Sequence, residues 1–201
     1  MKPYKEDLVD KPWHENADHP WTQMLADAYP VIRQELDALD KSQFTTWYQT
    51  ELYKSDSAAS WKVFGIWGFG KRNEEKAALM PETSKILDNI PGLTTAGISW
   101  FAPGTHIDPH LGFTNDVLRC HMGLIVPEDC AIRVGTEARP WKDGKVFVFD
   151  DTYEHEAWNH GTTDRFILLL DFLKNPAKKY HRRLMLRELA RGGADPTAGG
   201  F

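Results

Sequence analysis

Short apolar runs, each bounded by Pro, Gly, Asp or Asn, dominate the chain from about residue 93 onward, and this pattern is typical of β-strands. We expect strands over residues 95–102, 117–126, 130–134, 145–149 and 166–173. An aromatic and β-branched run predicts one more strand over residues 61–70. The spacing of these runs is that of an antiparallel sandwich.

Apolar residues at spacings of three and four predict helices outside this strand-rich part. We expect one continuous helix over residues 22–39, a helical or loop-helical segment over 72–87 with Pro81 at a helix start, and a basic helix over 175–190. Residues 1–20, with prolines and scattered charges, predict an irregular arm. The glycine-rich residues 191–201 predict a disordered tail.

The length of 201 residues fits a single domain. We divide it into an N-terminal arm and helix (1–60), a β core (61–174) and a C-terminal helix with a flexible tail (175–201). The net charge of −5 argues against nucleic acid or an anionic membrane as partner. No apolar run is long enough for a membrane span, and the N-terminal residues do not resemble a signal peptide. Two cysteines, Cys120 and Cys130, suit a reducing cytoplasm, which is the expected location.

Residue types that bind metals gather in residues 104–112, Gly-Thr-His-Ile-Asp-Pro-His-Leu-Gly. In an extended segment His106, Asp108 and His110 alternate onto one face, and His155 follows later in the chain. Two imidazoles with open positions beside them suit a non-haem iron site, and His106, Asp108 and His155 form a complete two-histidine, one-carboxylate triad. Strand geometry alone does not choose between His106, Asp108 and His110, and Pro109 can bend the chain there.

Cationic residues lie on two of the predicted strands. Alternation places Leu118, Cys120, Met122 and Leu124 on one face, and Arg119 with His121 on the other. Arg119 and His121 either face solvent or meet a buried anion inside a barrel. Arg165 begins a strand that is apolar on both faces, and its guanidinium either reaches water at the strand end or clamps a carboxylate.

Asp150 and Asp151 precede His155 and predict an acidic turn. The alternative is that one of them orients His155 from behind the metal site.

Taken together, these residues resemble the aspartyl/asparaginyl β-hydroxylase family of iron(II)- and 2-oxoglutarate-dependent oxygenases. The resemblance extends over roughly residues 61–171. Its motifs are Pro103-Gly104-Thr105-His106, His110-Leu111-Gly112, Thr114-Asn115, Leu118-Arg119-Cys120-His121-Met122-Gly123-Leu124, residues 141–145, Phe149-Asp150-Asp151, Glu154-His155-Glu156 and Arg165.

The resemblance implies a mainly β protein with flanking helices, a double-stranded β-helix of the jelly-roll, cupin-like type. It implies that His110 and His155 bind iron(II), and that Gly112 replaces the aspartate of the wider superfamily. It further implies that Arg119 and His121 contact the 1-carboxylate end of 2-oxoglutarate, while Ser99 and Arg165 hold its far carboxylate. The reaction would couple oxidative decarboxylation of 2-oxoglutarate by O2 to hydroxylation of an unactivated C–H bond.

One departure bears on the substrate. Where animal members of the family have an arginine that holds the acidic substrate, this chain has Val117. The loss of that charge weakens the case for an aspartyl side chain. An amino acid, a peptide or a small molecule is the expected substrate. The alternatives are a lipid acyl chain or small natural product with the same cofactors, and a non-catalytic cupin-like binding module.

Overall fold

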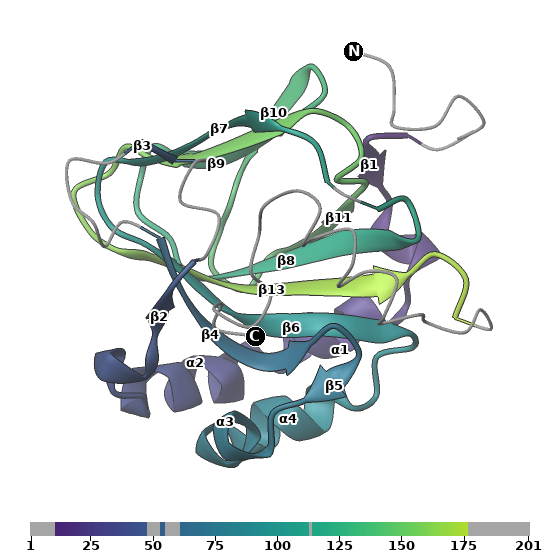
Figure 1. Cartoon of the computed structure of the whole chain (residues 1–201), viewed down its shortest axis with the longest axis vertical. Coiled ribbons are helices and arrows are strands. Elements are labelled where there is room, and N and C mark those ends of the chain that lie inside the picture. The colour runs from purple at the N-terminus through teal and green to yellow at the C-terminus, as the bar shows by residue number, and fades with distance from the viewer. Residues whose placement is uncertain (1–10, 48–52, 55–60, 113, 177–201) are drawn as a thin grey trace.

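The computed structural model describes residues 11–47, 53–54, 61–112 and 114–176, and its strands form two antiparallel sheets that face each other (Figure 1). The larger, called the major sheet, has the order β1 (Trp13–His14), β11 (Val146–Phe149), β8 (Val117–Ile125), β13 (Arg165–Leu173), β6 (Leu93–Phe101), β4 (Trp61–Gly68) and β2 (Thr45–Thr46), with β5 (Lys71–Arg72) paired to β4. The minor sheet has the order β10 (Glu137–Pro140), β9 (Cys130–Val134), β12 (His155–Asn159), β7 (Thr105–His110) and β3 (Tyr53–Lys54).

The chain winds back and forth between the two sheets. From β6 to β13, strands β6, β8, β11 and β13 lie in the major sheet, and β7, β9, β10 and β12 lie in the minor sheet. This winding is that of a double-stranded β-helix, the jelly-roll arrangement shared with cupins. The expected fold is therefore confirmed.

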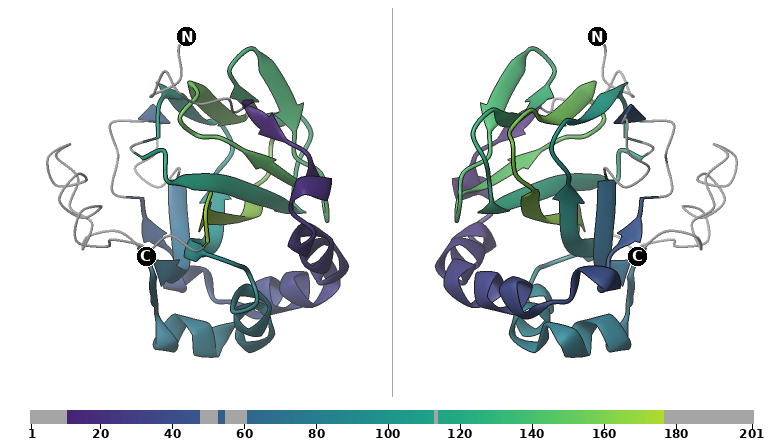
Figure 2. Two further views of the ribbon diagram at one scale, coloured as in Figure 1. Left: turned by 90° about the vertical axis from the view of Figure 1, so that its right-hand side faces the viewer. Right: turned by 90° about the vertical axis from the view of Figure 1, so that its left-hand side faces the viewer.

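Helices α1 (Trp21–Asp27), α2 (Tyr29–Ala38), α3 (Glu74–Leu79) and α4 (Pro81–Leu87) cover the outer face of the major sheet (Figures 1 and 2). Short 3-10 turns precede α1 (Asn16–Asp18) and follow α2 (Lys41–Gln43). The expectation of one helix over 22–39 is wrong, because Pro30 in the first turn of α2 has no N–H to continue the bonding pattern of α1. No helix within the described ranges is long and apolar enough to cross a lipid bilayer.

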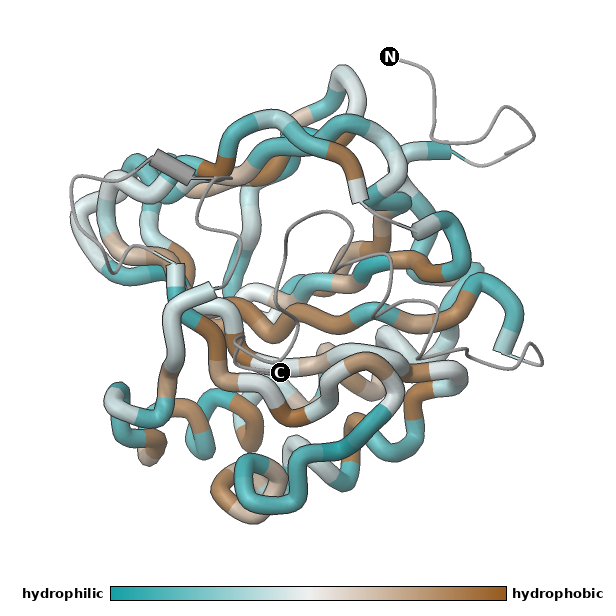
Figure 3. Tube along the Cα trace, in the orientation of Figure 1, coloured by the Kyte–Doolittle hydropathy of each residue, from teal (hydrophilic) through white to brown (hydrophobic). Residues whose placement is uncertain are grey.

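Two hydrophobic cores lie on opposite faces of the major sheet, whose strands carry long hydrophobic stretches (Figure 3). The outer core joins the sheet to the helices and contains Leu118, Cys120, Met122 and Leu124, as the alternation predicted. The inner core fills the space between the sheets. Both Cys120 and Cys130 are buried free thiols.

The expected strands are all present, and the segment of residues 106–110 is extended as strand β7. Strands β5, β10 and β12 lack the apolar runs that would have predicted them. The β structure also extends before residue 61, because β1, β2 and β3 pair with β11, β4 and β7. Trp13 on β1 is buried in the inner core, so this part of the expected irregular arm is a sheet edge. The helix and tail expected from residue 175 lie almost entirely outside the described residues.

Candidate active site

A cavity between the two sheets is lined by all six side chains that the sequence singled out: Ser99, His110, Arg119, His121, His155 and Arg165. They come from five strands. Ser99 lies on β6, His110 ends β7, Arg119 and His121 share β8, His155 begins β12, and Arg165 begins β13. Aromatic and aliphatic side chains complete the wall, so polar groups meet in a largely apolar space.

His110 and His155 face each other across the minor sheet, with ring centroids 4.2 Å apart. Each donates its Nδ1–H to the backbone carbonyl two residues earlier, His110 to Asp108 at 2.8 Å and His155 to Tyr153 at 2.9 Å. Burial lowers the pKa of both imidazoles, which favours the neutral form of each ring. A neutral imidazole whose Nδ1–H is occupied has its lone pair on Nε2, which is the form that binds a metal ion.

A β-bulge in β7 decides which of its residues face the cavity. His155 on β12 lies opposite His110, while Ala157 lies opposite Ile107, so two residues of β7 stand against one of β12. The extra residue reverses the alternation, and Ile107 and His110 both line the cavity. The expectation that residues 106, 108 and 110 share one face is wrong, because Pro109 sits in the bulge where regular pairing is lost.

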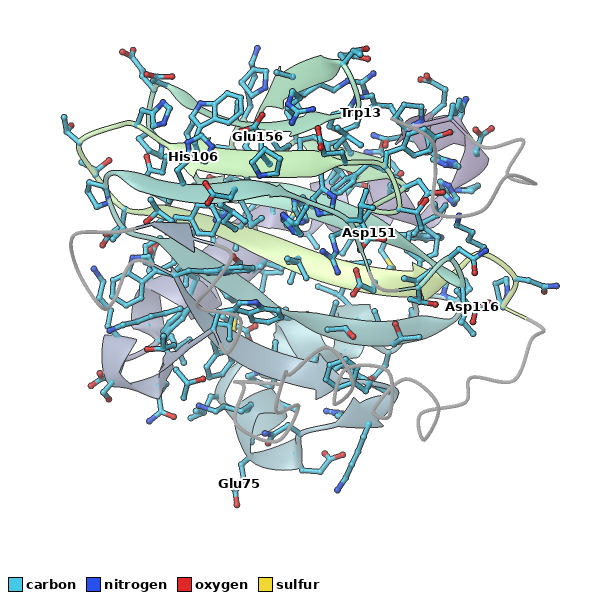
Figure 4. The ribbon with its side chains drawn as sticks, turned by 45° about the horizontal axis from the view of Figure 1, so that its top comes forward. Trp13, Glu75, His106, Asp116, Asp151 and Glu156 are labelled. Carbon is cyan, nitrogen blue, oxygen red and sulfur yellow. The ribbon has the colours of Figure 1, made fainter. Side chains whose placement is uncertain are left out.

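His106 consequently lies on the outer face of the minor sheet. Its Nε2 is hydrogen-bonded to Glu156 at 2.9 Å, and its ring stacks on Trp158. Figure 4 shows His106 and Glu156 together on that sheet, with Asp151 apart from them. The triad of His106, Asp108 and His155 is not brought together.

Arg165 is a buried cation, with only 1% of its surface exposed. Its guanidinium lies over Phe101 at 3.5 Å and over Trp141 at 4.8 Å, and Nη2 donates to Ser99 Oγ at 3.5 Å. No carboxylate among the described residues forms an ion pair with it, and burial lowers its pKa to about 9. A buried charge is costly unless it is paired, so this cavity favours an anionic ligand.

Arg119 differs from Arg165, because carboxylates of the protein surround it. Its Nε and Nη2 donate to both oxygens of Asp171, at 2.7 and 3.0 Å, and Nη2 lies 3.3 Å from Asp151 Oδ2. His121 lies near both arginines, and burial together with their charges lowers its pKa well below the usual range.

The two aspartates before His155 have different environments. Asp150 forms the predicted acidic turn, because its Oδ1 accepts from the N–H and the hydroxyl of Thr152. Asp151 instead reaches Arg119, its Oδ1 has no hydrogen-bond partner in the described part of the chain, and burial raises its pKa to about 7. The sequence left open that Asp150 or Asp151 orients His155; the structure instead places the Asp151 carboxylate beside Arg119.

Gly112 lies directly against Asp151. A Cβ at this position would stand 2.5 Å from both carboxylate oxygens of Asp151, and the Gly112 N–H donates to the Asp151 carbonyl at 2.7 Å. The Asp151 carboxylate therefore occupies the space that a side chain at residue 112 would need.

We expect Gly112→Ala to destabilise the metal-free protein by about 1–3 kcal/mol, because the methyl group displaces Asp151 from Arg119. Urea unfolding measures the loss. In an Asp151→Ala background the same substitution should cost much less, since the space is then free. An equal cost in both backgrounds would show that the clash does not govern this position.

Among the described residues, no group of three or more His, Cys, Asp or Glu side chains is arranged to hold a metal ion. The site thus consists of two histidines, with glycine at residue 112.

Residues 26–175 match the family model described as aspartyl/asparaginyl beta-hydroxylase. The chain belongs to this hydroxylase family.

Individual members of the aspartyl/asparaginyl β-hydroxylase family share a substantial part of the sequence. An ornithine lipid ester-linked acyl 2-hydroxylase of Rhizobium tropici is 41% identical over 188 residues, which are 89% of this chain and 67% of that protein. The human aspartyl/asparaginyl beta-hydroxylase is 33% identical over 174 residues, which are 82% of this chain but 23% of that protein. A Pseudomonas putida prolyl-4-hydroxylase structure aligns with a TM-score of 0.49 at 13% identity, over 77% of this chain and 99% of that one.

Proposed function

We propose that this protein is an iron(II)- and 2-oxoglutarate-dependent dioxygenase that hydroxylates an unactivated C–H bond. The observation that carries the proposal is Arg165, a buried guanidinium without a carboxylate partner among the described residues, in the cavity that also holds His110 and His155. A cavity with two metal-binding imidazoles and one uncompensated cation fits a metal ion together with a small organic anion.

His110 and His155 would hold iron(II) through their Nε2 atoms, because their Nδ1–H groups are engaged by the backbone. Arg165, with Ser99 beside it, would bind the far carboxylate of 2-oxoglutarate, and Arg119 and His121 the other end. Iron(II) with 2-oxoglutarate and O2 supplies the oxidising power when bound. The largely apolar lining of the cavity would limit the access of water to the reacting groups.

For the substrate, we infer the acyl chain of a lipid in preference to an aspartyl side chain. The Rhizobium tropici relative named for acyl 2-hydroxylation supports this choice, as does Val117. Val117 is buried opposite Leu173 and stands where animal members of the family have the arginine that holds an acidic substrate. An apolar pair at this place suits a hydrocarbon chain better than a carboxylate.

The test is incubation with iron(II), 2-oxoglutarate and air, with ester-linked acyl lipids and aspartyl peptides offered in parallel. We expect a lipid product heavier by one oxygen atom, formed with one succinate per turnover, and little change in the peptides; mass spectrometry and a succinate assay measure both. The matched control is His155→Ala. Efficient peptide hydroxylation would contradict the substrate assignment, and absence of succinate with every compound would favour a binding module.

A further inference from the structure

Trp141 separates the cavity from a groove on the outside of the protein. It follows β10 directly, is buried in the inner core, and lines the cavity beside His121 and Arg165. Its other side borders an outer groove with Pro140, Lys142 and Trp158. A residue in this place can act on the cavity without contacting a metal ligand.

The indole of Trp141 determines where His121 carries its proton. Its Nε1–H donates to His121 Nδ1 at 3.3 Å, and an indole nitrogen can only donate. His121 Nδ1 must therefore carry a lone pair, which leaves the proton of the neutral ring on Nε2. His121 Nε2 is buried and has no hydrogen-bond partner among the described residues, so it is a donor available to a ligand in the cavity.

The same indole also restrains Arg165. The guanidinium carbon lies 4.8 Å from the Trp141 ring centroid and 3.5 Å from that of Phe101, so two aromatic rings contact the cation. Stacking against aromatic faces favours a defined orientation of the planar guanidinium. Two pairs of side chains are proposed to bind 2-oxoglutarate, Arg119 with His121 and Ser99 with Arg165. Trp141 thus contacts one member of each pair, His121 and Arg165.

We propose that Trp141 is a positioning residue for the anionic co-substrate: it fixes the Nε2–H tautomer of His121 by its hydrogen bond and the plane of Arg165 by stacking. The cavity then presents a neutral N–H donor and a guanidinium in a set arrangement before any ligand binds. This role rests on the proposed function for the identity of the anion, whereas the tautomer of His121 is a property of the protein alone.

Trp141→Phe tests the proposal, because it keeps an aromatic ring and removes the N–H. The matched control is Trp13→Phe. Trp13 is buried in the same core and packs on Phe147 as Trp141 does, but its indole nitrogen has no hydrogen-bond partner among the described residues. Both variants lose the same atoms, but only Trp141→Phe removes the hydrogen bond to His121 and alters the ring that lies against Arg165.

Two measurements are compared in the three proteins. Long-range proton–nitrogen NMR on the metal-free protein, with His121 assigned by a His121→Gln variant, should show a single Nε2–H tautomer in the wild type and in Trp13→Phe. A mixture of tautomers is expected in Trp141→Phe. The KM for 2-oxoglutarate should rise roughly fivefold in Trp141→Phe, with a smaller fall in kcat, and stay within about twofold in Trp13→Phe.

A proton on Nδ1 in the wild type, or one unchanged tautomer in Trp141→Phe, would overturn the proposal. Equal effects of the two tryptophan substitutions on KM would also overturn it, because they would indicate packing alone. If the wild type does not bind 2-oxoglutarate, the proposed function fails, and the NMR comparison still decides the role of Trp141.

Discussion

His110→Ala and His155→Ala should each lose metal binding and turnover. The two rings face each other at 4.2 Å with their Nε2 atoms available, and no third ligand-type side chain joins them within the described residues. Loss of one of two protein ligands should weaken metal binding by more than about 100-fold, since loss of an outer partner alone costs about 10–100-fold. Calorimetric titration with Mn(II) measures the affinity, and succinate formation measures turnover.

His106→Ala and Asp108→Ala are the matched controls for this experiment. His106 is hydrogen-bonded to Glu156 on the outer face of the minor sheet, and Asp108 lies in the bulge. Both variants should bind Mn(II) with nearly the wild-type affinity and keep substantial activity. A dead Asp108→Ala with an active His110→Ala would mean that the ligands are His106, Asp108 and His155, and that the bulge is not where the structure has it.

Arg165→Met should separate stability from co-substrate binding. In the wild type, saturating Mn(II) and 2-oxoglutarate should raise the melting temperature more than either does alone, since a ligand at 100 times its Kd adds about 2.7 kcal/mol. In Arg165→Met, the metal ion should still raise the melting temperature, whereas 2-oxoglutarate should no longer raise it. Without ligands, the variant should be as stable as the wild type or more stable by about 1–2 kcal/mol, because it removes a buried cation without a counter-charge.

Arg139→Met provides the control for Arg165→Met. Arg139 also lies over an aromatic ring, that of Trp13 at 4.2 Å, but it is partly exposed and pairs with Glu137 outside the cavity. Arg139→Met should leave unchanged the rise in melting temperature that each of the two ligands produces. Differential scanning fluorimetry with each ligand alone and with both measures all three proteins. A full 2-oxoglutarate increment in Arg165→Met would refute the assigned carboxylate clamp.

Local sequence pattern predicted most of the β structure. Strands β6, β8, β9, β11 and β13 are apolar runs, and the split of β8 into an apolar face and a face with Arg119 and His121 follows from strand alternation alone. Strands β10 and β12 escaped prediction because each is short and contains no run of apolar residues. The break at Ala28 could have been predicted from Pro30, whose missing N–H stops helix propagation.

The sequence by itself predicted which residues come together, since all six selected side chains line one cavity, while the role of each stays a prediction. Tertiary structure alone decided how they face one another. The bulge in β7 exists only relative to β12, and it turns His110 inward and His106 outward. The lack of a carboxylate partner for Arg165 and the contact of Asp151 with Gly112 likewise depend on which strands become neighbours. Local pattern fixes which side of a strand a residue lies on, but pairing, register and burial arise between segments far apart in the chain.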